Sequence, residues 1–217
     1  MRAPRSADSP ESLITAIRDE GIRDERVIDA FRRVDRAGFV TRAEVARAYE
    51  DRPLRIPHRQ VTTQPSLIAR MVEGLRLTGE ERVLEVGTGL GFQTAILALL
   101  AREVFSIERF ADLAEQAKAN LDAAGIERVT VLVGDGTRGV AEHAPYDAIL
   151  VSAAAPEVPS PLVEQLVEEG LIVHPVGPGG SEVVVAFRKE GAGLVQEARL
   201  TGAYFVPLVG RHGLPEG

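Results

Sequence analysis

The sequence predicts an α/β fold in which a doubly wound, parallel sheet is covered by helices on both faces. From residue 82 onward, short runs of valine, isoleucine and leucine alternate with helical stretches, which is typical of strands buried on both faces. A glycine-rich turn joins the first of these runs to the helix that follows. The chain has 217 residues, 45% of them hydrophobic and 26% charged, as expected for one folded domain.

The N-terminal part of the chain predicts helices rather than strands. Residues 1–10 are polar, and we expect them to form a disordered tail. Ser9 and Pro10 are suited to begin a helix that ends at Gly21. Asp24 is suited to cap a second helix, because the apolar residues at 27, 28, 31 and 34 share one helical face. We expect a third, short helix over residues 43–49.

The remaining elements follow from the loop onward. A segment with prolines at 53 and 57 leads into a loop at 61–65, and a further helix carries the apolar residues from Leu67 to Leu75. We assign residues 11–65 to a helical cover with the substrate loop, and residues 66–217 to the core of the same domain. Helices are expected at 91–101 and 111–123. Strands are expected at 83–86, 103–107, 129–133, 148–151, 171–173 and 183–187.

Composition excludes several classes of function. The formal net charge is −7, so we do not expect binding to nucleic acid, which normally needs a basic face. Cysteine is absent and the 4 histidines are scattered, so neither disulfides nor a local metal motif are predicted. The sequence has no apolar run that would span a membrane and no apolar signal-peptide core, so we expect no membrane association and a cytoplasmic protein.

The strongest functional signal is the glycine-rich turn after the first core strand. Its glycines are Gly87, Gly89 and Gly91, and Glu85 lies two residues before them. Dinucleotide-binding loops place the third glycine one residue further along the chain than it stands here. The shorter spacing suits S-adenosylmethionine, which has no pyrophosphate to place at a helix N-terminus. Glu85 is suited to meet the ammonium group of that cofactor directly or through water.

Two further acids support an adenosyl cofactor. Glu108 ends the second strand, where an acid is suited to hold both ribose hydroxyls. Asp135 lies between two glycines after the third strand, where it can accept a hydrogen bond from the adenine amino group while Gly136 lets the ring lie close. Alone, each acid is also explained by an ordinary turn or helix cap. Together they follow consecutive strands whose carboxyl ends line one crevice, which favours the cofactor.

Several segments together resemble the protein-L-isoaspartate O-methyltransferase family. The glycine loop is common among methyltransferases, whereas the loop at 63–65, the segment at 153–159 and the ending at 205–208 are more specific as a set. The resemblance covers roughly residues 27–209, and its segments are 60–65, 83–93, 106–108, 134–136, 153–159 and 205–208. It implies transfer of the methyl group of S-adenosylmethionine to the α-carboxylate of an L-isoaspartyl residue in a damaged protein or peptide, leaving S-adenosyl-L-homocysteine. The methyl ester then closes to a succinimide, which reopens partly as aspartate.

The resemblance also implies roles for particular residues. Thr63 takes the position of a serine or threonine of the family whose hydroxyl contacts the substrate carboxylate, and it is our candidate catalytic residue. Asp51 matches an aspartate that orders this loop. The other residues that we expect to border the substrate are Arg59, Val61, Thr62, Gln64, Pro65 and Val206. The residues that we expect to contact the cofactor are Glu85, Gly87, Thr88, Gly89, Gly91, Glu108, Asp135 and Gly136.

The chain departs from the family pattern at the loop, where Arg59 adds a charge that favours acidic substrates and Thr63 adds a methyl group to the expected hydroxyl. A carboxylate nucleophile is already ionised at neutral pH, so no general base is needed. We therefore interpret His58 as a surface residue and Ser152 as structural. The alternatives are an aspartate methyltransferase for one small precursor peptide, a binding module without turnover, and an NAD oxidoreductase. We expect a monomer.

Overall fold

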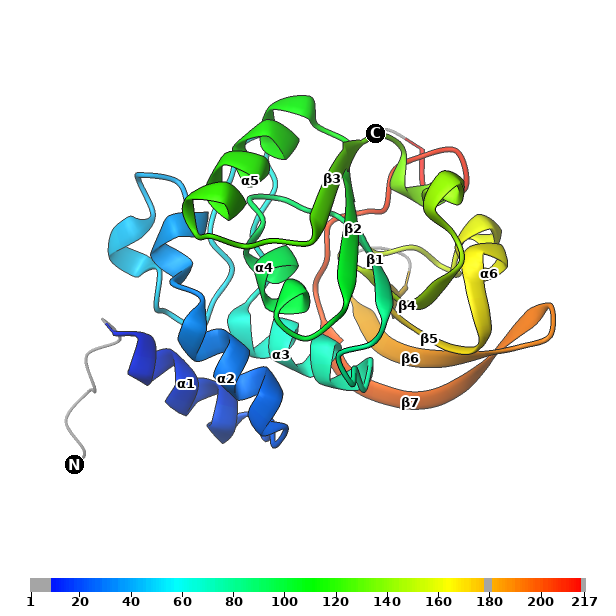
Figure 1. Cartoon of the computed structure of the whole chain (residues 1–217), viewed down its shortest axis with the longest axis horizontal. Helices are drawn as coiled ribbons and strands as arrows, with labels where there is room; N and C mark the ends of the chain where they lie inside the picture. Colours follow the sequence, from blue (N-terminus) through cyan, green and yellow to red (C-terminus); the bar gives the residue numbers. More distant parts are fainter. Residues whose placement is uncertain (1–8, 178–180, 216–217) are drawn as a thin grey trace.

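A seven-stranded sheet runs through the molecule in the order β3-β2-β1-β4-β5-β6-β7 (Figure 1). The structure is a computed structural model that describes residues 9–177 and 181–215. The strands are β1 (Arg82–Val86), β2 (Glu103–Glu108), β3 (Val129–Val133), β4 (Tyr146–Val151), β5 (Leu166–Val176), β6 (Glu182–Glu190) and β7 (Gly193–Ala203). Strands β1 to β5 pair in parallel, which confirms the predicted α/β fold over this part of the chain.

The last two strands correct the prediction of an all-parallel sheet. Strand β6 pairs antiparallel with β5, and β7 pairs antiparallel with β6. Only residues 177–181 separate β5 from β6, whereas a parallel connection needs about a dozen residues or more. Strand β7 was not predicted from the sequence, because it has no continuous apolar run and much of the strand is exposed.

Ten helical segments complete the described part of the chain: α1 (Pro10–Asp19), α2 (Glu25–Arg33), η1 (Arg36–Phe39), η2 (Val45–Arg47), α3 (Pro65–Gly74), α4 (Phe92–Ala98), α5 (Ala111–Ala123), η3 (Gly136–Arg138), η4 (Ala141–His143) and α6 (Ser160–Gln165), where η denotes a 3₁₀ helix. The caps predicted for α1 and α2 are confirmed, since Ser9 Oγ accepts from Ser12 N at 3.3 Å and Asp24 Oδ1 accepts from Arg26 N at 2.8 Å. Among the described residues, no helix is long and apolar enough to cross a membrane.

Two N-terminal predictions need correction. Of the expected tail, Ser9 and Pro10 belong to the start of α1, and residues 1–8 lie outside the described part of the chain. The helix expected over 43–49 is only the 3₁₀ turn η2, which has no buried residue and therefore little packing to extend it.

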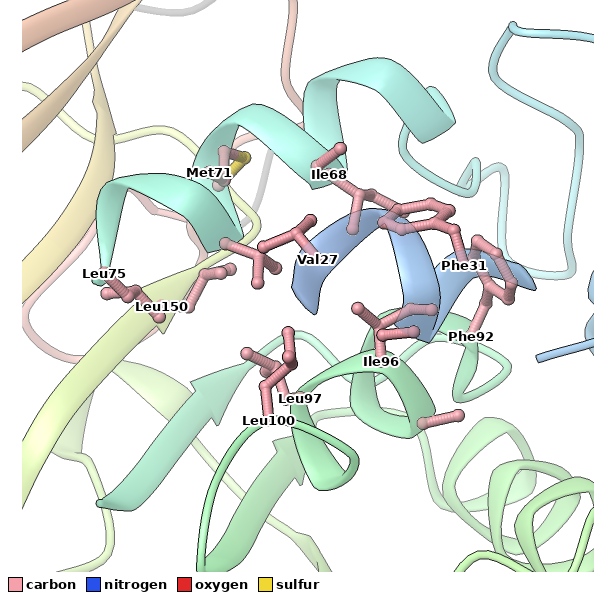
Figure 2. Close-up of a cluster of buried hydrophobic side chains, with 14 of the residues drawn as sticks. Val27, Phe31, Ile68, Met71, Leu75, Phe92, Ile96, Leu97, Leu100 and Leu150 are labelled. Carbon is pink, nitrogen blue, oxygen red and sulfur yellow. The ribbon is translucent and has the colours of Figure 1, made fainter. Parts of the chain in front are cut away.

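Alternate residues of the central strands face two hydrophobic clusters. On one face, Val83 of β1 and Leu150 of β4 join a large cluster with α1 to α5, part of which is shown in Figure 2. On the other face, Leu84 and Ile149 join a cluster with α6 and the C-terminal Leu208. Because α1 and α2 pack into the same cluster as the sheet, the N-terminal cover is fixed to the core beside α3 and α4.

The C-terminal segment after β7 returns to the carboxyl ends of the parallel strands. There Ala154 N donates to Val206 O at 2.8 Å, and Leu208 N donates to Ala154 O at 2.7 Å. These paired bonds hold residues 206–208 beside the segment that follows β4. Residues far from one another in the sequence thus meet at one edge of the sheet.

His174 of β5 is fully buried, and burial lowers the pKa of its imidazole to about 4, opposed only in part by the nearby backbone of Ala155 and Glu157. The unfolded chain takes up this proton near the ordinary pKa of about 6.5, whereas the folded chain does not. We therefore expect this residue to lower the free energy of unfolding by about 2–3 kcal/mol as the pH falls from 6.5 to 4.

Urea denaturation between pH 4 and 7.5 measures this effect. His174→Leu removes the titrating group, so the fall in stability with acid is expected to be shallower in this variant than in the wild type. His212→Leu, at an exposed histidine, is the matched control. Equal pH slopes for His174→Leu and the wild type would contradict the expectation.

Candidate functional site

The glycine-rich turn lies at the carboxyl end of β1, where the chain turns sharply into α4. Gly87, Gly89 and Gly91 have φ angles of 98°, 57° and 93°, a region that residues with a side chain rarely adopt. A Cβ atom on Gly87 would also lie 3.3 Å from Ser152 Cβ. The backbone therefore favours glycine at all three positions, and at Gly87 the close approach of the segment after β4 does so as well.

A cavity of about 330 Å³ opens beside this turn. Its walls come from the turn, the ends of β1 and β2, the loop before α3, and the C-terminal segment. Nine of the predicted site residues line it: Val61, Thr62, Thr63, Gly87, Thr88, Gly89, Glu108, Gly136 and Val206. The structure thus brings together most of the residues that the sequence pointed to.

Glu108 is the acid best placed in this cavity. It ends β2, and its side-chain Oε2 accepts a hydrogen bond from Gly89 N at 2.9 Å while Oε1 accepts from Phe110 N at 3.1 Å. A carboxylate has about four lone-pair positions, so acceptor capacity remains for a ligand. The two backbone bonds hold the carboxylate still against the glycine turn.

Gly136 forms the cavity wall at the end of β3, next to Asp135. A Cβ atom on Gly136 would lie 2.5 Å from Val86 Cγ1, so only glycine leaves this wall open. Asp135 does not line the cavity, because its carboxylate accepts hydrogen bonds from Thr137 N at 2.9 Å and Arg211 N at 2.8 Å. These bonds hold the pKa of Asp135 below its usual range despite the opposing effect of burial.

Glu85 is placed differently from the expectation. Its side chain is fully buried beneath the turn and does not line the cavity. It accepts hydrogen bonds from Gln93 Nε2 at 2.8 Å and from the hydroxyls of Thr94 and Ser106 at 2.5 Å each. Burial raises its pKa to about 7. In this structure Glu85 ties β1 to α4 and β2 rather than facing a ligand.

The loop before α3 is held by two side chains. Asp51 Oδ1 accepts from Ser66 N at 2.8 Å and its Oδ2 accepts from Gln64 Nε2 at 3.0 Å, which confirms the ordering role predicted for Asp51. Thr62 Oγ1 accepts from Leu54 N at 3.1 Å, and Thr62 N donates to Leu54 O at 2.8 Å. The loop therefore has a fixed backbone.

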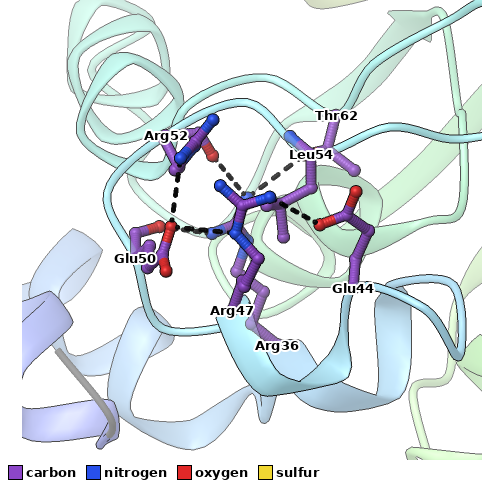
Figure 3. A network of polar contacts seen from close by, with 7 residues as sticks. All are labelled: Arg36, Glu44, Arg47, Glu50, Arg52, Leu54 and Thr62. Carbon is purple, nitrogen blue, oxygen red and sulfur yellow. Dashed lines mark hydrogen bonds and ion pairs between the residues drawn. The ribbon is translucent and has the colours of Figure 1, made fainter.

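Arg36 is the main anchor of this loop and was missed in the sequence analysis (Figure 3). Its guanidinium is buried and donates to Ala48 O at 3.0 Å, Glu50 O at 2.8 Å, Arg52 O at 3.1 Å and Thr62 Oγ1 at 3.1 Å. Burial lowers its pKa to about 10, so it stays charged at neutral pH. Nothing in the sequence signals this role, because the acceptors are mostly main-chain carbonyls.

His58 was interpreted as a surface residue, but it also lines the cavity. Its ring stacks on Phe110 with centroids 4.1 Å apart, and its Nε2 lies 2.8 Å from both carboxylate oxygens of Asp112. These contacts clamp the loop against the start of α5. The partners are more than fifty residues away in the sequence, so no local pattern could have found them.

A second cavity of about 330 Å³ adjoins the first on the side of β7. Gln64 lines this second cavity, whereas Arg59, Pro65 and Gly91 line neither. Five residues line both cavities, and we call them the junction: Val61, Thr62, Thr63, Ser152 and Val206. Among the described residues, no group of three or more histidine, aspartate or glutamate side chains is arranged to hold a metal ion.

Solved structures share this fold. A protein-L-isoaspartate O-methyltransferase of known structure is 31% identical with a TM-score of 0.82, and covers 91% of this chain, which spans 65% of that protein's chain. A putative protein of the same kind from Plasmodium falciparum, in complex with S-adenosyl-L-homocysteine, is 24% identical with a TM-score of 0.77 over 90% of this chain and 96% of its own. Together, fold and site define a Rossmann-like, S-adenosylmethionine-dependent methyltransferase.

The sequence comparisons narrow this class to one family. The family described as protein-L-isoaspartate(D-aspartate) O-methyltransferase matches residues 8–213, and the chain belongs to it. The protein-L-isoaspartate O-methyltransferase of Methanoculleus marisnigri is 46% identical over 97% of this chain and 95% of its own length. That of Koribacter versatilis is 43% identical over 95% of this chain and 92% of its own.

Proposed function

We propose that this chain transfers the methyl group of S-adenosylmethionine to the free α-carboxylate of L-isoaspartyl residues in damaged proteins and peptides. Membership of the family supports this function. The observation that carries it is the junction, where Thr63 lines both cavities. One cavity contains Glu108 and Gly136, and the second, beside β7, is proposed to take the substrate. Glu108 and the open wall at Gly136 fit a ribose and an adenine ring.

The residues of the chain act by holding both partners in place. Bound S-adenosylmethionine supplies a methyl group on a positively charged sulfur, which is an electrophile without further activation. Thr63 and the main chain of Val61 and Thr62 orient the substrate carboxylate, which is already ionised at neutral pH. Positioning is therefore the main catalytic contribution, and no side chain needs to remove a proton.

Labelled methyl transfer to paired peptides tests this function. The two peptides differ only in carrying aspartate or isoaspartate at one position, and we expect label only in the isoaspartyl peptide. Equal labelling of both peptides, or labelling of neither, would overturn the assignment. Exclusive labelling of the aspartyl peptide would instead favour an aspartate methyltransferase with a dedicated precursor.

Three properties stay predictions from the sequence: a monomeric state, a cytoplasmic location and the absence of nucleic-acid binding. We propose that Glu85, Gly91 and Asp135 support the cofactor cavity from behind its walls, since they hold the turn and the 3₁₀ helix η3 in place. Arg59 is exposed, and we propose that it acts on approaching acidic substrates rather than in the cavity.

A further inference from the structure

Ser152 stands at the place where the two reacting molecules must meet if the proposed function holds. It follows directly after β4 and lines both cavities. Its backbone N donates to Val86 O at 2.8 Å, so its main chain is an extension of the sheet. The position of its hydroxyl therefore depends on the side-chain torsion and on what holds that hydroxyl.

The hydroxyl of Ser152 is held by Gln93 from α4. Gln93 Nε2 donates to Ser152 Oγ at 2.8 Å and also to Glu85 Oε1 at 2.8 Å. Above its pKa of about 7 the Glu85 carboxylate only accepts hydrogen bonds, so the amide nitrogen of Gln93 has to face Glu85. The amide oxygen of Gln93 is then left without a donor among the described residues. The orientation of the amide is thus fixed by Glu85 even at the cost of one unpaired buried acceptor.

This arrangement leaves the proton of Ser152 for a ligand. Its oxygen accepts from Gln93, and no acceptor for its own O–H is found within the described part of the chain. Thr62, another hydroxyl residue of the junction, already accepts from Leu54 N and Arg36 Nη2. Those two bonds fix Thr62 to the loop but do not use its own O–H proton. Among the described residues, Ser152 is thus one of three junction hydroxyls with a proton for a bound carboxylate, and it is the one whose oxygen is held by Gln93.

We propose that Ser152 donates a hydrogen bond to the α-carboxylate of the substrate and sets its orientation at the junction, with Gln93 as the positioning residue behind it. This inference rests on the proposed function. The carboxylate loses its charge as it becomes an ester, so a hydrogen bond to it is strongest before the reaction. Loss of the bond is therefore expected to weaken substrate binding more than turnover.

Steady-state kinetics of Ser152→Ala test the proposal. The assay uses the full chain, an isoaspartyl peptide, and pH 8, above the pKa of about 7 of the Glu85 carboxyl. We expect the KM for the peptide to rise about tenfold to a hundredfold, the range for a lost hydrogen bond to a charged group, with kcat changed less than about threefold. Ser152→Thr keeps the hydroxyl and is expected to restore most of the affinity. Ser160→Ala, at an exposed serine of α6, is the matched control.

Binding of S-adenosyl-L-homocysteine by calorimetry separates this role from a structural one. Under the proposal, its Kd in Ser152→Ala stays within about twofold of the wild type, because the lost bond goes to the substrate. A parallel rise in that Kd, or an unchanged KM for the peptide, would overturn the proposal. If the wild type itself does not label the isoaspartyl peptide, the proposed function fails and the inference with it, whereas an active wild type with an unaffected Ser152→Ala refutes only the inference.

Gln93→Leu tests the positioning role of Gln93 independently. If Gln93 acts through Ser152, the double variant with Ser152→Ala is expected to have the same KM as Ser152→Ala alone, within about twofold. Multiplication of the two single effects would show that Gln93 acts elsewhere and would overturn its positioning role.

Discussion

Replacing Arg36 by methionine is expected to lower the free energy of unfolding by about 3 kcal/mol and to remove most of the methyl transfer. The substitution keeps a long side chain but leaves Ala48 O and Arg52 O without a donor in the described part of the chain. Glu50 O and Thr62 Oγ1 each lose one of their two donors. These acceptors belong to the segment that positions the loop at 61–63. Urea denaturation and the labelled-methyl assay measure the two effects.

Two further protein variants test whether the lost hydrogen bonds of Arg36 cause these effects. Arg32→Met changes an exposed arginine of the neighbouring helix α2, and it should stay within about 0.5 kcal/mol of the wild type. Arg36→Lys keeps the charge but cannot fork to four acceptors, so it should fall between the wild type and Arg36→Met. A stable and fully active Arg36→Met would show that the loop does not depend on this anchor.

Glu108→Ala is expected to raise the Kd for S-adenosyl-L-homocysteine about a hundredfold, which corresponds to the loss of two hydrogen bonds from ribose hydroxyls to a carboxylate. Its side chain is nearly buried and already fixed by Gly89 N and Phe110 N, so little ordering is needed on binding. Calorimetric titration measures the constant directly and does not depend on substrate.

Glu108→Gln refines the same experiment, since it retains one acceptor oxygen and should show a smaller rise of about tenfold. Glu115→Gln, at an exposed acid of α5, is the control and should bind like the wild type. A Glu108→Ala variant with unchanged affinity would contradict the ribose assignment.

Local sequence patterns predicted most of the fold. Helix α5 begins and ends at the residues predicted for it, and the five parallel strands were all found, because buried apolar runs are a property of neighbouring residues. Strand β7 was not predicted, because a half-exposed strand has no continuous apolar run. Its place in the sheet depends on pairing with β6, which only the folded chain reveals.

The site was predictable where backbone form requires a residue type. Gly87, Gly89 and Gly136 were found because only glycine fits their angles or their close approaches. The orientation of the Glu85 side chain could not be predicted from the sequence, because its three hydrogen-bond donors come from α4 and β2. Arg36 and His58 depend on partners distant in the sequence or on main-chain carbonyls, which leave no trace in residue type.

The return of the C-terminal segment to the sheet edge has a consequence for synthesis of the protein. Val206 is the last residue of the junction to leave the ribosome, long after the glycine turn and Glu108. A domain generally folds as a unit, so the cavities are not closed before this last wall has been synthesised. Until that wall docks against Ala154, the junction stays open to water. The junction is therefore complete only after residues 206–208 have been synthesised and have docked.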